Sequence, residues 1–368
     1  MSAAEASESI SKLSIDSKLS INSLDTSHIQ IFGRALRNVL SSDAAELTYG
    51  QIVDGFPIAS VDEDNLGGTI SFLHPIHTKH TELCPGVLER LRKIQDTSDI
   101  TSLQFDSKLV YAYNNTLLGS REFETRLIEM TAVVVHQIAV QLFKSETSLH
   151  ENDDDMVNWK DDDDEDCVGL GVEVTMPPTL FRHLYYCDYE QYPDGIAGGV
   201  GYWAENRIFG GVILFDRRAP GSSPNLNNPL EVDPNAIYFH SSRRMTTGRI
   251  YQLLPNQRSA LVKYLLSETT PPAECPFPLL ATKANIKRID TEERIVDTGV
   301  YRDTWERKDL GMEDFYRDLD NRVYSVVDFP TDEDAHDEMR RMSMRKARVY
   351  HAWREESLKE KAKREAAV

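Results

Sequence analysis

Apolar side chains repeat with helical spacing over much of the first 145 residues. Between residues 28 and 40 they recur at intervals of three and four, which is the pattern of one helical face. A second helix is predicted from Pro85, because proline is favoured in the first helical turn. Residues 121–144 carry the strongest pattern, and their apolar side chains cover more than one stripe. We therefore expect this helix to be enclosed at the centre of the core.

Shorter apolar runs predict strands. They lie at 108–113, 199–202, 208–215, 236–240 and 248–253, and turn-forming residues bound them. The last four would form an antiparallel meander, followed by a helix over 255–267. A long helix over about 332–366 would end the chain. The pattern predicts an α+β fold with a central buried helix, an antiparallel β-meander and a long C-terminal helix, because regular strand–helix alternation is missing.

Composition separates two polar segments from the folded part. Residues 1–27 contain nine serines and predict a disordered tail. The run 151–166 holds ten carboxylates and a single lysine, and their repulsion predicts a disordered insertion over 148–167. This insertion would interrupt one α+β domain spanning 28–330, and the charged C-terminal helix would occupy 331–368.

The charge and the apolar pattern exclude several classes. A net charge of −19 argues against nucleic-acid binding, which needs a surplus of Lys and Arg. The amino terminus lacks the pattern of a secretory signal, and the longest apolar stretch, 132–143, is too short to span a membrane. The four cysteines are widely separated and form no C-x-x-C pair, which is typical of free thiols in a reducing compartment. We expect a cytoplasmic or nuclear protein.

Two aromatic segments carry a family resemblance. Residues 181–195 (FRHLYYCDYEQYPDG) and 201–217 (GYWAENRIFGGVILFDR) resemble a family of uncharacterised proteins from filamentous fungi. Residues 237–240 (IYFH) and 299–307 (GVYRDTWER) fit the same pattern, so that the resemblance covers about residues 120–330. It implies a fungal source and a shared fold, but no reaction and no ligand.

A histidine cluster is a candidate metal site. His74, His77 and His80 lie within seven residues, and Cys84 follows closely, with Glu82 as another possible ligand. His74 precedes proline, which favours an extended or polyproline conformation. A polyproline helix repeats every three residues, so the three imidazoles would share one face. With Cys84 they would suit zinc, copper or nickel, whereas a surface loop with clustered histidines would give the same spacing. No other cofactor is predicted.

Two further groups are candidates for binding or catalysis. His183, Asp188 and Glu190 lie among tyrosines and would supply acid–base groups if they shared a pocket with His240 and Arg243. Guanidinium groups near turn amides are the parts of an anion pocket, and the candidates are Arg217, Arg243, Arg244 and Arg249. Ordinary pairing of these arginines with Asp and Glu explains them equally well.

No nucleophile elbow, P-loop or dinucleotide fingerprint occurs in the chain. We therefore favour a non-catalytic intracellular protein that binds a ligand or a protein partner and has a regulatory role. The alternative is an enzyme, with or without a metal, that has a pocket around His183, Asp188, Glu190, His240 and Arg243.

The terminal segment fits the binding interpretation. Residues 340–368 hold ten Lys or Arg against four Glu, a balance of +6, together with apolar side chains. A basic helix of this kind suits an acidic partner, a calmodulin-like groove or an anionic surface. Pairing with the acidic run 151–166 of the same chain is the interaction that we expect first, because the two blocks carry opposite charge.

Overall fold

The computed structural model describes residues 18–66, 73–97, 103–145, 149–150, 153, 156, 159, 177–224, 228, 230–269, 272, 274–291, 293–308, 325 and 327–366. The described chain starts with strand β1 (Lys18–Ser20), which pairs with β2 (Gln104–Asp106), and with the short helix η1 (Ile21–Ser23). These elements fall inside the segment 1–27 that we predicted to be a disordered tail, so that prediction is wrong from Lys18 onward. A three-residue strand was missed because its order comes from a partner more than 80 residues away.

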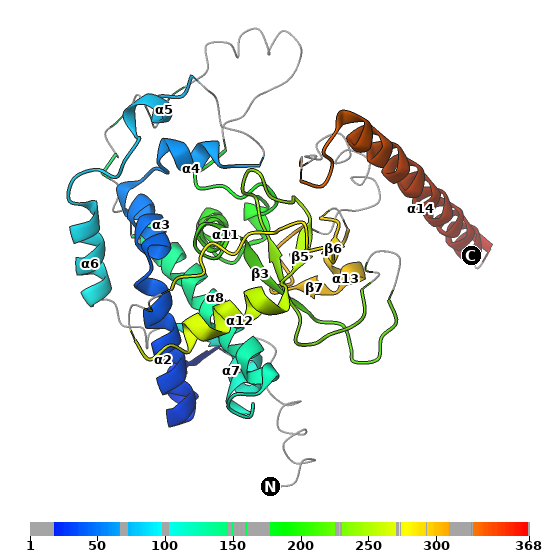
Figure 1. Ribbon diagram of the computed structural model, residues 1–368. Coiled ribbons are helices and arrows are strands. Elements are labelled where there is room, and N and C mark those ends of the chain that lie inside the picture. Colours follow the sequence, from blue (N-terminus) through cyan, green and yellow to red (C-terminus); the bar gives the residue numbers. More distant parts are fainter. Residues whose placement is uncertain are drawn as a thin grey trace.

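Helix α8 (Arg121–Lys144) lies at the centre of the molecule, with the bounds that the pattern predicts. It packs most extensively against α11 (Ile196–Phe209), and also against α2 (Thr26–Leu40), α3 (Asp43–Asp54) and α7 (Ser107–Asn114). The Ser120 hydroxyl accepts a hydrogen bond from the Phe123 amide and caps its start. Figure 1 shows α8 and α11 side by side, with the sheet next to them.

Burial explains the composition of α8. Among the described residues it is the helix that is long and apolar enough to cross a membrane by length and composition alone. However, 61% of its most apolar stretch is buried inside the protein. Neighbours on several sides require apolar side chains on several faces, so α8 is the core helix that we predicted.

The main sheet has five antiparallel strands in the order β6-β5-β4-β3-β7. Their bounds are β3 Val212–Asp216, β4 Ile237–His240, β5 Ile250–Gln252, β6 Arg288–Ile289 and β7 Val300–Tyr301. Alternate residues face opposite sides: Ile213 and Phe215 join the core around α8, whereas Val212 and Leu214 pack in a second cluster with buried tyrosines. Helices and an antiparallel sheet thus form an α+β fold, as predicted.

Two predicted strands are helical. Residues 199–202 belong to α11, and its glycines permit close packing rather than a turn. A Cβ at Gly199 would lie 2.3 Å from the Tyr189 ring, and one at Gly201 would lie 2.5 Å from the His136 ring. Residues 108–113 belong to α7. A short apolar run cannot distinguish a strand from a helix, and here the Asp106 carboxylate caps the Lys108 amide and starts a helix.

The remaining elements lie around this core. They are α4 (Ala59–Glu63), α5 (Ile76–Lys79), α6 (Val87–Thr97), η3 (Tyr189–Gln191), α12 (Pro255–Leu265), α13 (Ile295–Thr298) and α14 (Asp332–Ala366). Helices α6, α12 and α14 confirm the helices that the sequence predicts from Pro85, over 255–267 and over about 332–366. Figure 1 shows α3, α4, α5 and α6 gathered on one side of the molecule, away from α14.

Candidate metal centre

Four potential metal ligands converge beside the end of α3. They are Asp54, His80, Cys84 and His150, and one ligand atom of each lies within 4.8 Å of the others. Asp54 is the last residue of α3, whose C-cap Gly55 adopts a φ of 113°. His80 follows α5, Cys84 precedes α6, and His150 follows α8. Three segments that are distant in the sequence therefore meet at one point.

Backbone hydrogen bonds hold these segments together. The Leu149 amide donates to the Asp54 carbonyl at 2.9 Å, and the Ala59 amide donates to the His80 carbonyl at 2.9 Å. The Cys84 amide donates to Asp54 Oδ2 at 2.8 Å. The ligand atoms are thus positioned by the fold itself, before any ion is considered.

Three separations within the quartet are those of hydrogen bonds or ion pairs. His80 Nε2 lies 3.1 Å from Asp54 Oδ2, and His150 Nε2 lies 3.2 Å from Asp54 Oδ1. Cys84 Sγ lies 3.4 Å from His150 Nε2. In a tetrahedral zinc site with bonds of about 2.0–2.3 Å, ligand atoms lie about 3.3–3.8 Å apart. The two distances to Asp54 are shorter than this range and involve its two different oxygens, and the other pairs lie within 4.8 Å, so an ion would require these side chains to shift.

Both imidazoles present the same nitrogen to the quartet. His80 Nδ1 lies 3.1 Å from the Pro57 carbonyl oxygen, and His150 Nδ1 lies 3.6 Å from Asp153 Oδ2. A histidine that donates from Nδ1 to a carbonyl or a carboxylate keeps the Nε2 lone pair for a metal. His80 has the outer hydrogen bond that is typical of a metal-ligating histidine, whereas the contact of His150 with Asp153 is an ion-pair distance and not a hydrogen bond.

Burial and charge set the protonation of the other two ligands. Asp54 is fully buried, which by itself raises the carboxyl pKa, but hydrogen bonds from His80 and the Cys84 amide hold that pKa below its ordinary value. Burial and the Asp54 charge raise the pKa of the Cys84 thiol to about 11. A divalent cation would reverse this effect and favour the thiolate. The carboxylate and the thiolate together would balance its charge.

A buried ion pair is the other arrangement that these atoms allow. If His80 is doubly protonated, its two N–H groups can donate to the Pro57 carbonyl and to Asp54 without any metal. The two arrangements differ at Cys84. A metal site requires its thiolate as a ligand, whereas the ion pair between His80 and Asp54 forms without it. Metal-dependent behaviour of Cys84 therefore separates them.

The structure brings together only half of the predicted histidine–cysteine set. His80 and Cys84 belong to the quartet, whereas His74 and His77 do not. His77 faces Asp62 at 3.7 Å, and the His74 ring lies edge-on to Trp159 with centroids 5.0 Å apart. The predicted polyproline segment is wrong, because residues 76–79 form the helical turn α5.

Sequence reasoning missed Asp54 and His150. They lie 26 residues before His80 and 66 residues after Cys84, and no local spacing connects them. His150 also falls inside the insertion 148–167 that we predicted to be disordered. Of that insertion the structure describes Leu149, His150, Asp153, Met156 and Trp159, and the rest lies outside the described residues.

The predicted acid–base group does not form one pocket. His183 and His240 are neighbours, with His183 Nε2 at 3.2 Å from the His240 carbonyl oxygen, but both side chains are completely buried. Burial lowers the pKa of His183 to about 3, so this imidazole is neutral. Asp188 instead accepts a hydrogen bond from the Lys308 amide at 2.8 Å, and Glu190 lies on η3.

The predicted anion-binding arginines have acidic partners or separate positions. Arg217 pairs with Glu129. Arg243 lies 2.9 Å from Asp64, and Arg249 lies 2.8 Å from Asp290. Arg244 is exposed, and its backbone amide donates to the Asp64 carbonyl. The structure thus agrees with ordinary ion pairing for three of the four.

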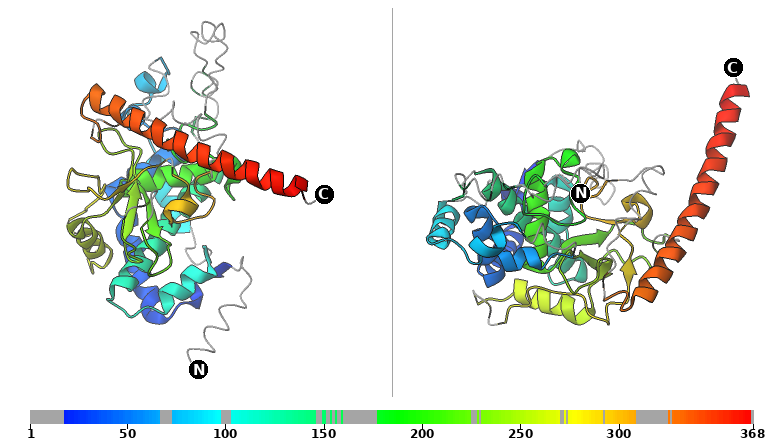
Figure 2. Two further views of the ribbon diagram at one scale, coloured as in Figure 1. Left: turned by 90° about the vertical axis from the view of Figure 1, so that its right-hand side faces the viewer. Right: turned by 90° about the horizontal axis from the view of Figure 1, so that it is seen from above.

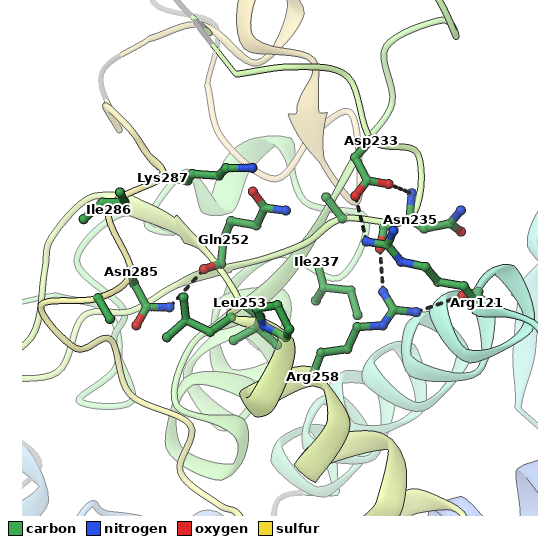
Figure 3. A pocket seen from close by; sticks show the side chains of 14 residues that line it. Arg121, Asp233, Asn235, Ile237, Gln252, Leu253, Arg258, Asn285, Ile286 and Lys287 are labelled. Carbon is green, nitrogen blue, oxygen red and sulfur yellow. Dashed lines mark hydrogen bonds and ion pairs between the residues drawn. The ribbon is translucent and has the colours of Figure 1, made fainter.

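A separate open pocket of about 620 Å³ lies between the starts of α8 and α12 and one end of the sheet (Figure 3). Its two arginines are engaged: Arg121 pairs with Asp233 at 2.7 Å, and Arg258 donates to the Arg121 and Asn235 carbonyls, while Lys287 also lines the pocket. None of the predicted site residues lines it.

In comparisons with known proteins, no family model, no curated protein and no solved structure matches the chain. The resemblance to fungal proteins therefore stays a prediction. The geometry of the quartet is then the main indication of function.

Proposed function

We propose that this chain is a non-catalytic zinc-binding protein in which the ion is held by Asp54, His80, Cys84 and His150. The observation that carries the proposal is the convergence of four potential ligand side chains, whose ligand atoms lie within 4.8 Å of one another, with the His80 ring oriented by a hydrogen bond to the Pro57 carbonyl. Its biological role is to bind a ligand or a protein partner, in the cytoplasm or the nucleus.

The ligand set favours zinc over other divalent ions. Calcium and magnesium prefer oxygen ligands, of which Asp54 supplies the only side-chain group here. Two imidazoles, one thiolate and one carboxylate suit zinc in a tetrahedral shell. Four protein ligands fill that shell and leave no position for a reactive water, which is the arrangement of a structural site.

The ion would join the helical layer to the segment after α8. The Phe56 ring lies 5.1 Å from the His150 ring and 6.3 Å from the His80 ring, between centroids. Phe56 also packs with Ile76 and Met156 in a small apolar cluster. Zinc therefore stabilises this corner, and metal binding contributes to the stability of the folded chain.

A catalytic role has weaker support. The enzyme alternative needs a substrate to reach His183 and His240, and both are completely buried. Glu190 is the exposed member of the set and lies on η3.

Zinc content and melting temperature test the proposal. The purified full chain, stripped and reloaded, should bind one zinc ion, and excess zinc should raise the Tm by several degrees. At a free zinc concentration of about a thousand times Kd, the gain is about 4 kcal/mol. His80→Ala and Cys84→Ala should abolish the rise. His77→Ala is the matched control, because His77 is close in sequence but outside the quartet.

Cobalt substitution adds a readout of geometry. Tetrahedral Co²⁺ bound through a thiolate gives intense visible bands and a sulfur charge-transfer band, which Cys84→Ser should remove. A Tm that responds equally to zinc in wild type, His77→Ala and Cys84→Ala would contradict the proposal and favour the buried ion pair.

A further inference from the structure

Helix α14 leaves the body of the protein. Its 35 residues extend about 50 Å at about 1.5 Å per residue. Figure 2 shows that the helix touches the rest of the molecule near its start and then projects away from it. Among its described residues, the ion pairs are local, between Arg340 and Asp337 and between Arg341 and Glu338. The projecting part therefore gains little from packing against its own chain.

One face of the projecting helix is apolar. Met339, Met342, Tyr350 and Trp353 follow one another at intervals of three, eight and three residues, which places them on one helical face. Met342 is buried near the body, whereas Met339 is 40% and Trp353 is 38% exposed. The Tyr350 and Trp353 rings lie 5.7 Å apart between centroids. The stripe continues beyond the point where the body covers it.

The same segment is basic in an acidic protein. Residues 340–368 carry +6, so the remainder of the chain carries −25, which is −19 less +6. A planar anionic membrane that met the helix along its length would also approach the acidic body and be repelled. A protein groove, in contrast, encloses only the projecting part of the helix. Most of that part is farther from the acidic body than the Debye length of about 8 Å, so salt screens the repulsion between the body and the partner. Charge and shape thus favour a protein groove.

We propose that α14 is a docking helix for an acidic protein with an apolar, helix-binding groove. The groove covers the Tyr350–Trp353 face, and its carboxylates meet basic side chains such as Lys359 and Lys361, both of which are exposed. Tryptophan and tyrosine are effective anchors because they bury a large area with few rotatable bonds. This interaction is independent of the zinc centre.

Calcium-loaded calmodulin is the probe, because it presents an acidic groove lined by methionines. Full-length zinc-loaded protein is titrated with it at physiological salt, and the affinity is measured by calorimetry. We expect a saturable complex. Trp353→Ala and the double variant Lys359→Glu/Lys361→Glu should each weaken it at least about tenfold. Leu117→Ala is the matched control, since Leu117 is an exposed apolar residue elsewhere, and it should bind like wild type.

Three further arms decide the source of recognition. His80→Ala should dock like the wild-type protein, whatever its zinc content. A peptide of residues 151–166 supplies negative charge without a groove, and equal affinity for it would overturn the proposal in favour of charge pairing within the chain. Binding to vesicles of phosphatidylserine and phosphatidylcholine in place of calmodulin would overturn it in favour of a membrane. Absence of a complex, or one that Trp353→Ala leaves unchanged, would also overturn it.

Discussion

Asp54→Asn should make the Cys84 thiol easier to ionise. In the metal-free protein the pKa of this thiol is about 11, against an ordinary value of 9.0, and the Asp54 charge is the largest cause after burial. Asparagine keeps the size of the side chain but removes the negative charge. The thiolate then loses a repelling neighbour, so its pKa must fall.

The structure gives the scale of the change. The ligand atoms of Asp54 and Cys84 lie within 4.8 Å, where two unit charges interact by about 3.5 kcal/mol at an effective dielectric constant of about 20. Cys84 is only half-buried, and solvent screens much of this interaction. We therefore expect the thiol pKa to fall from about 11 to about 10, which means about tenfold more thiolate at neutral pH.

Alkylation by iodoacetamide measures this effect. The metal-free protein is treated at a series of pH values, and the modified Cys84 peptide is quantified by mass spectrometry, so that the other cysteines do not interfere. The pH profile of Asp54→Asn should be displaced to lower pH. Asp62→Asn is the matched control, because Asp62 is equally buried but faces His77. Profiles of wild type and Asp54→Asn that coincide would refute the convergence of these two side chains.

Three other changes test the outer ligand shell, the core and the buried histidines. Asp153→Asn should weaken zinc binding about 10–100-fold without abolishing it, because it loosens the orientation of His150; competition with a chelator measures this. Gly201→Ala should lower the free energy of unfolding, measured in urea, by about 1–3 kcal/mol, because a Cβ would lie 2.5 Å from the His136 ring. Gly33→Ala is the control and should be neutral or stabilising, because the nearest atom to its Cβ would be 3.7 Å away. The pKa of His183 is about 3 in the folded protein and about 6.5 in the unfolded chain. Between about pH 3 and about pH 6.5 the unfolded chain therefore binds more protons than the folded protein. Stability should fall as pH decreases from about 6.5 toward 3, and His183→Gln should flatten that dependence; an unchanged slope in urea unfolding would contradict the assignment.

Part of the candidate site could be read from spacing alone. The short cluster His74–Cys84 lies in one of the segments that form the candidate site, and two of its members are in the quartet. The other two ligands could not be predicted, because Asp54 and His150 come from segments that meet only when α3 and α8 pack together. The resemblance to fungal proteins adds no ligand, since it implies no chemistry.

The sequence by itself determined the elements whose stability is local. Helices α8, α12 and α14 begin at the predicted residues, because amphipathic periodicity and helix-starting residues act within a few turns of the chain. Strands β4 and β5 were also predicted, since their apolar runs are bounded by turn residues. The α+β class follows from the order of these elements.

Tertiary structure decided the features that depend on neighbours distant in the sequence. The glycines at 199 and 201 have a low intrinsic helix propensity, yet two aromatic rings packed against α11 require them in a helix. Likewise, α5 turns His74 and His77 away from a site that their spacing had suggested. Side-chain direction at such positions is set by packing between segments, and a local pattern carries no information about which segments will meet.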